Sequence, residues 1–125
     1  MERNIKKKIK KEKLESEIQR EILDFLGSKH LFFWRENSTG LFDVNRMGFR
    51  RKGIYEMLGV ADILLLLDGR FIAIEVKTRV GKLSDNQKLF GQQVVKNGGT
   101  YLVVRSLEEF KQYWAYHHES NSKSA

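Results

Sequence analysis

"ADILLLLDGRFIAIEVK", residues 61–77, decides how the middle of the chain folds. Two runs rich in isoleucine, leucine and other β-prone residues flank the dipeptide Asp68-Gly69. Asp-Gly between such runs is a strong signal for a β-hairpin closed by a two-residue turn. With these two residues as the turn, counting outward along both strands sets Asp62 directly opposite Glu75.

One face of this predicted hairpin carries three charges. Side chains alternate along a strand, so Asp62, Glu75 and Lys77 share one face while Val76 points to the other. Directly opposed residues have Cβ atoms about 4.5–5.5 Å apart, and like charges placed there destabilise a sheet. Some positive charge must therefore hold the two carboxylates together.

Two sources of positive charge fit this arrangement. Lys77 could neutralise one carboxylate in a structural ion pair. A divalent metal is the other source, because hard cations prefer carboxylate oxygens and Mg²⁺ takes only one or two of them while keeping several waters. Charges are costly to bury without a purpose, so we expect a Mg²⁺ site, which Mn²⁺ would also fill. The ion pair is the alternative.

The rest of the sequence predicts an α/β domain with a mixed sheet flanked by helices. Apolar spacing predicts a helix from Leu14 to Leu26, with Gly27 as its stop. A capping box, Ser84-Asp85-Asn86-Gln87, opens a second helix that runs to about Lys96. Further elements are strands at 31–35 and 100–105, a long connection at 36–60 and a last helix after Ser106. We expect a basic arm at 1–13, one domain at 14–117 and a polar tail at 118–125.

Two further polar residues lie on helix faces that should be apolar. Glu15 falls inside the apolar stripe of the first predicted helix, although a position so near the helix start also lets it reach solvent. Gln87 shares a helix face with Phe90 and Val94, which would turn it toward the sheet. As the fourth residue of the capping box, however, it is also explained by capping alone.

The composition favours a polyanionic partner. The chain has 125 residues, a formal net charge of +7 and a pI near 9.7, and such basic proteins often bind nucleic acid. The basic cluster Arg46, Arg50, Arg51 and Lys52 would contact phosphates, or would simply be a solvated surface. There are no cysteines, so a metal must rest on oxygen or imidazole ligands. No apolar run suits a membrane span or a signal peptide, and we expect an intracellular protein without membrane contact.

The order of these residues resembles a known nuclease superfamily. Asp62 followed by Glu75-Val76-Lys77 is similar to the D…ExK signature of the PD-(D/E)XK nucleases. Within that superfamily the chain resembles a stand-alone VRR-Nuc domain over about Leu14 to Phe110. The supporting sequences are "ESEIQ", Trp34-Arg35 with Asn37 and Gly40, "GVADIL", "IAIEVKTRVGKLSDNQ" and "GGTYLVVRS". Ala61 stands where many members carry proline.

The resemblance implies a restriction-endonuclease-like core and a role for each matching residue. Asp62, Glu75 and the backbone carbonyl of Val76 would hold the metal. Lys77 would position the attacking water and stabilise charge at the phosphate. Gln87 would orient the lysine or the water, and Glu15 would reach the metal's coordination shell through a water.

A substrate is also implied by the resemblance. Small VRR-Nuc proteins resemble phage-type resolvases, which act in DNA recombination and repair as homodimers that nick four-way (Holliday) junctions. We therefore expect a metal-dependent DNA endonuclease in a bacterial or, if phage-encoded, host-cell cytoplasm. Arg35 and the basic cluster would contact DNA phosphates. The alternatives are a nuclease of flaps or nicked duplex, a restriction-like enzyme, and a DNA-binding module without catalysis.

Overall fold

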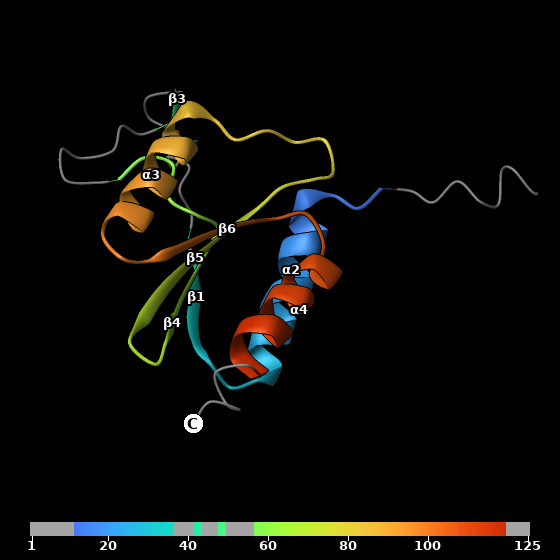
Figure 1. Cartoon of the computed structure of the whole chain (residues 1–125). Helices are drawn as coiled ribbons and strands as arrows, with labels where there is room; N and C mark the ends of the chain where they lie inside the picture. The colour runs from blue at the N-terminus through green and yellow to red at the C-terminus, as the bar shows by residue number, and fades with distance from the viewer. Residues whose placement is uncertain (1–11, 37–41, 44–47, 50–56, 120–125) are drawn as a thin grey trace, which may run out of the picture.

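The computed structural model describes residues 12–36, 42–43, 48–49 and 57–119 (Figure 1). Among these residues, no helix is both long enough and apolar enough to cross a membrane. The elements follow the order α2 (Glu15–Ser28), β1 (Phe32–Arg35), β2 (Phe42–Asp43), β3 (Gly48–Phe49), β4 (Ile63–Leu67), β5 (Arg70–Val76), α3 (Asp85–Lys96), β6 (Thr100–Val104), α4 (Leu107–Trp114) and the π-helical turn η1 (Ala115–Glu119).

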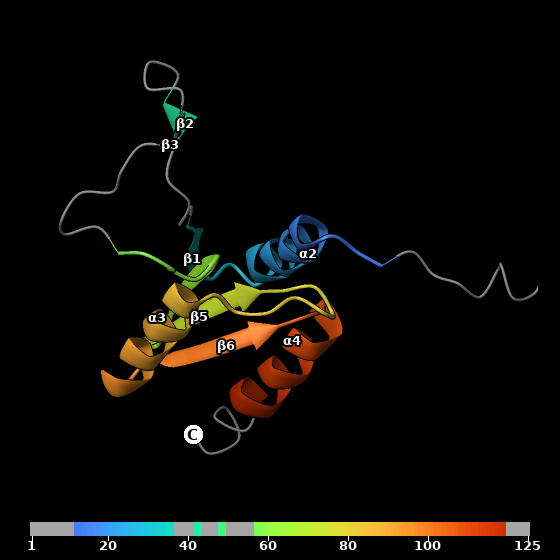
Figure 2. The same ribbon diagram turned by 90° about the horizontal axis from the view of Figure 1, so that it is seen from above.

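Four of the strands form one mixed sheet in the order β1-β4-β5-β6. The β1–β4 and β4–β5 pairs are antiparallel, and β5 and β6 are parallel; Figure 2 shows these last two arrows pointing the same way. The predicted α/β class and mixed sheet are therefore confirmed. Within the long 36–60 connection, β2 and β3 form a separate two-stranded antiparallel ribbon.

The central hairpin has the predicted register. Leu67 pairs with Arg70 at the turn, and Ile63 pairs with Ile74 at the far end of β4. Asp68 and Gly69 close the turn with φ values of 50° and 78°. Two consecutive positive φ angles are what a type I′ turn requires, and aspartate and glycine both tolerate them.

Helices cover both faces of the sheet. Figure 1 shows α2 and α4 together on one side and α3 on the other. The larger apolar core lies beneath α2 and α4 and contains Ile18, Ile22, Leu26, Ile63, Leu65, Ile72, Ile74, Val76, Val104 and Phe110. The smaller core beneath α3 contains Ala61, Leu64, Ala73, Phe90 and Val94. Odd-numbered residues of β5 therefore face α3, and Glu75 is one of them.

Two details of the first helix differ from prediction. Gly27 does not end α2, which continues to Ser28 and closes with Lys29 as its C-cap. His30 takes the left-handed conformation after the helix, with φ 55°, a role that glycine more often fills. Leu14 precedes the helix and is exposed rather than part of the buried stripe.

Some predictions concern residues outside the described ranges. Most of the predicted basic arm and of the polar tail fall there. The same holds for the basic cluster, which comprises Arg46, Arg50, Arg51 and Lys52. Their proposed phosphate contacts stay predictions.

Candidate active site

The open end of the hairpin carries Asp62, Glu75 and Lys77. Asp62 lies just before β4, where its carbonyl accepts a 2.7 Å hydrogen bond from the Glu36 N–H. Its Oδ2 accepts a 2.8 Å bond from the Val76 N–H on the neighbouring strand. The Lys77 N–H donates to the Val104 carbonyl at 3.0 Å, which extends the β5–β6 pairing. Neighbouring strands thus fix the backbone at all three positions.

Glu75 is the most buried charged residue of the site. It is 1% exposed, and Lys77 is 9% exposed. Glu75 Oε1 accepts a 2.7 Å hydrogen bond from Gln87 Nε2, and Lys77 Nζ lies 3.9 Å from the same oxygen, too far for a hydrogen bond. Glu75 Oε2 is buried without any hydrogen-bond partner. A carboxylate oxygen left in this state is open to another ligand.

Gln87 caps α3 and also faces the sheet, while its expected role toward Lys77 or a water stays a prediction. Its Oε1 accepts a 2.8 Å bond from the Ser84 N–H, and its N–H donates to Ser84 Oγ at 3.2 Å, which completes the capping box. The other end of the same amide donates to Glu75. The start of α3 therefore fixes the orientation of a side chain that holds Glu75.

The electrostatics of the site show an excess of negative charge. Burial and then the nearby charge of Asp62 raise the pKa of Glu75 from its ordinary 4.5 to about 8, against the opposing effect of Lys77. Burial is also the main cause that raises the pKa of Asp62, whose hydrogen bond from Val76 acts in the opposite direction. The single positive charge of Lys77 does not neutralise two carboxylates that are partly removed from solvent. An ion pair with Lys77 alone leaves the site short of positive charge.

The charges of Glu15 and Arg35, which lie at the edges of the site, affect the pKa values of its carboxyl groups. Glu15 is the first residue of α2 and is partly buried. Its charge contributes to the raised pKa values of both Asp62 and Glu75. Arg35 is exposed at the end of β1, and its charge lowers the pKa of Asp62. The fold thus brings the inward-facing Glu15 near the carboxylate pair.

The donor set fits a hard divalent cation. Within the described part of the chain, no three His, Cys, Asp or Glu side chains gather in a metal-binding group. Mg²⁺ needs no such group, because it keeps most of its waters and takes one or two carboxylates. The unpartnered Glu75 Oε2 beside Asp62 offers oxygen ligands of that kind. No contact of the Val76 carbonyl tests its predicted role as a ligand.

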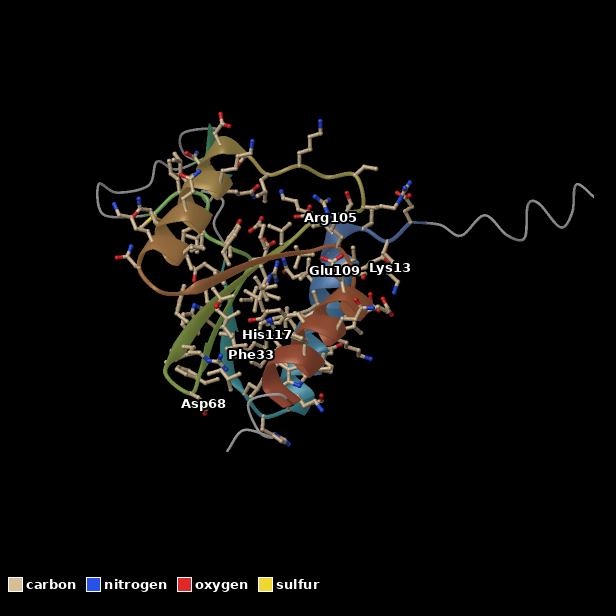
Figure 3. All side chains as sticks on the ribbon, in the orientation of Figure 1. Lys13, Phe33, Asp68, Arg105, Glu109 and His117 are labelled. Atoms are coloured by element: carbon tan, nitrogen blue, oxygen red, sulfur yellow. The ribbon has the colours of Figure 1, made fainter. Side chains whose placement is uncertain are left out.

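Arg105 holds the loop that joins the site to α3. Its Nη1 donates to the Thr78 carbonyl at 2.6 Å and to the Gly81 carbonyl at 2.7 Å, and Figure 3 shows it beside this loop. Three of the loop's carbonyls, including Arg79 at 3.3 Å, point to this one nitrogen. No sequence pattern indicated this contact, because Arg105 was predicted only as the last residue of a strand.

Gly59 permits a close approach between the segment that leads to Asp62 and the start of α3. It has φ 72°, and a Cβ atom there would lie 2.4 Å from the backbone carbonyl carbon of Asn86 and 2.7 Å from the Gln87 nitrogen. The segment that leads to Asp62 therefore rests directly on the first turn of α3. Backbone atoms cannot rotate away as a flexible side chain can.

Gly59→Ala is therefore expected to destabilise the protein by about 2 kcal/mol or more, since strain at positive φ adds to a backbone clash. Urea unfolding measures the loss. Gly69→Ala is the matched control, because Gly69 has φ 78° but nothing lies within 4 Å of an added Cβ. Equal losses in the two variants would show that the contact with α3 does not matter.

No protein-family model matches this sequence, and comparisons with curated proteins and with solved structures return no match either. Residue chemistry and site geometry are therefore the basis for a functional assignment.

Proposed function

We propose that the protein is a divalent-metal-dependent DNA endonuclease of the VRR-Nuc type, with the restriction-endonuclease-like core of the PD-(D/E)XK superfamily. The observation that supports this most strongly is the buried Glu75 carboxylate, whose Oε2 has no partner, beside Asp62 and Lys77. A buried carboxylate oxygen without a partner costs stability, which favours a ligand that completes the site. The order of the matching residues along the sequence supports the same assignment.

The reaction requires an activated water, charge neutralisation at the scissile phosphate and a stabilised leaving oxygen. Mg²⁺ held by Asp62 and Glu75 would act as a Lewis acid on the phosphate and lower the pKa of water. Lys77 Nζ, which lies 3.9 Å from Glu75 Oε1, orients the attacking water and offsets charge that develops on the phosphate. Gln87 and the Val76 N–H hold the two carboxylates in place.

Four-way DNA junctions are the proposed substrate, cut by a homodimer. The net charge of +7 suits a polyanion, and phosphate contacts provide affinity without sequence preference. Arg35 is exposed at the end of β1 and close enough to affect Asp62, so its guanidinium can meet a phosphate that approaches the site. A two-fold dimer also matches the two-fold symmetry of the junction.

Cleavage assays test this proposal directly. Purified protein is incubated with four-way junction, flap, nicked and linear duplex DNA in Mg²⁺, Mn²⁺ or EDTA. We expect cleavage of the junction with either metal, products with 5′-phosphate and 3′-hydroxyl ends, and no cleavage in EDTA. Equal cutting of all four substrates would contradict junction selectivity, and a monomer at working concentration would contradict the dimer.

Asp62→Asn is expected to lower cleavage by more than about 100-fold, because the amide keeps the hydrogen bond from Val76 but loses the charge. Asp68→Asn is the matched control at the far end of the hairpin (Figure 3), where asparagine also tolerates the positive φ. Full activity of the Asp62→Asn variant would remove Asp62 from the metal site. Salt-dependent DNA binding by the wild-type protein without cleavage in either metal would favour a binding module instead.

A further inference from the structure

Tyr101 lies next to the carboxylate site on the neighbouring strand. It pairs with Ala73 in the parallel β5–β6 ladder, two residues before the partner of Glu75. Side chains alternate along both strands, so Tyr101 and Glu75 occupy the same face, the one that α3 covers. Diagonal neighbours of this kind are within reach of a long aromatic side chain.

The ring of Tyr101 is held tightly between β6 and α3. It meets the Phe90 ring edge to face, with 6.0 Å between centroids. A Cβ atom at Gly91 would lie 2.6 Å from Tyr101 Cδ2, so the absence of a side chain at residue 91 makes room for the ring. The direction of the hydroxyl is therefore set by the packing of α3 on the sheet.

The hydroxyl of Tyr101 is buried without a hydrogen-bond partner. Among the described residues, the other buried side-chain atom in this state is Glu75 Oε2. Leaving a buried hydroxyl unpaired costs stability, and phenylalanine would fill the same space without that cost. The two unpaired atoms are complementary, because a phenol donates a hydrogen bond and a carboxylate oxygen accepts one.

The raised pKa of Tyr101 agrees with its position near Glu75. Burial is the main cause that raises the pKa of Tyr101 above its ordinary value, and the charges of Glu75 and then Asp62 raise it further. The phenol therefore stays protonated and keeps its hydrogen to donate. It faces the carboxylate pair rather than the α2 side of the sheet.

We propose that Tyr101 is a positioning residue of the carboxylate site, whose hydroxyl donates a hydrogen bond through a bridging water to the free oxygen of Glu75. This inference rests on the proposed metal-dependent function. A bridging water suits two buried polar atoms that do not bond directly. Partners of this kind orient metal-binding carboxylates, and their loss costs about 10-fold to 100-fold in metal affinity or activity.

The test is Tyr101→Phe, which removes the hydroxyl and keeps the ring against Phe90 and Gly91. Tyr113→Phe is the matched control, since Tyr113 lies on α4 and packs against the core on the opposite face of the sheet. Titration calorimetry with Mn²⁺ alone is expected to show about 10-fold or greater weakening for Tyr101→Phe and no change for Tyr113→Phe. The Mn²⁺ concentration for half-maximal DNA cleavage should rise by a similar factor.

A merely structural role would give a different result. Thermal unfolding in EDTA should show little change for Tyr101→Phe, because the ring keeps its packing against Phe90 and only a water-mediated hydrogen bond is lost. A wild-type protein that binds Mn²⁺ and cuts DNA, together with a Tyr101→Phe variant that does both equally well, would overturn this inference alone. A wild-type protein that binds no Mn²⁺ would overturn the proposed function and this inference with it.

Discussion

Replacement of Glu75 by glutamine is expected to abolish metal-dependent cleavage and, at the same time, to stabilise the metal-free protein. Glutamine keeps an oxygen that can accept the hydrogen bond from Gln87 Nε2, so the local packing survives. It removes a charge that is 1% exposed and lies beside Asp62. A residue that serves only the fold would show the opposite effect on stability.

The gain in stability should depend on pH in a defined direction. The pKa of Glu75 rises from 4.5 in the unfolded chain to about 8 in the folded protein. Between these values the folded state binds more protons than the unfolded state, so wild-type stability falls as the pH rises through this window. The other charges that face Glu75 are Asp62, Lys77 and Glu15.

Urea unfolding in EDTA at pH 5 and pH 8 measures this difference. A tenfold difference in proton affinity corresponds to about 1.4 kcal/mol. The free energy of unfolding of Glu75→Gln should therefore exceed that of the wild type by more than about 1 kcal/mol at pH 8 and by much less at pH 5. Glu109 is exposed on α4, so Glu109→Gln serves as the control, and its free energy of unfolding should differ little from that of the wild type. A Glu75→Gln variant that is less stable than the wild type at pH 8 would mean that Glu75 is a structural ion-pair residue.

Replacement of Lys77 by methionine should lower the rate of the chemical step by roughly 100-fold to 10,000-fold, the range for loss of a group that handles a proton or charge in the transition state. Lys77 is 9% exposed, so its side chain contributes little to the surface that DNA would contact. Binding of DNA should therefore stay nearly intact. Single-turnover cleavage and a separate binding titration in Ca²⁺ distinguish the two effects.

Lys82→Met provides the control for Lys77. Lys82 is an exposed lysine in the loop between β5 and α3, so its replacement should leave the chemical step unchanged. A Lys77→Met variant that loses DNA binding but cuts bound DNA at the wild-type rate would show that Lys77 is a phosphate contact and not part of the chemistry.

The hairpin could be predicted from the sequence because the residues that determine it are close together in the sequence. Asp68-Gly69 specifies the turn, the turn specifies the register of the two strands, and alternation along the strand places Glu75 on the same face as Lys77. The position of Gln87 followed in the same way from the capping box, whose residues are adjacent in sequence. Both the capping by Gln87 and its direction toward the sheet are observed, and its expected role toward Lys77 or a water stays a prediction.

Other features depend on contacts between distant segments and could not be predicted. The contacts of Gly59, Tyr101 and Arg105 arise only when α3 packs on the sheet and the loop after β5 meets the end of β6. The end of α2 was predicted at Gly27, since glycine is the commonest residue after a helix. The chain instead turns at His30, which adopts the left-handed conformation less often than glycine does.

Binding of Mn²⁺ to the metal-free protein tests the carboxylate site most directly. Electron paramagnetic resonance of free Mn²⁺ during a titration gives the number of sites and their affinity without any DNA. The arrangement of Asp62 and Glu75 predicts a saturable Mn²⁺ site that disappears in Asp62→Asn and in Glu75→Gln and persists in Asp68→Asn. A wild-type protein that binds no Mn²⁺, or variants that bind it as well as the wild type, would contradict the assignment of these two carboxylates as a metal site.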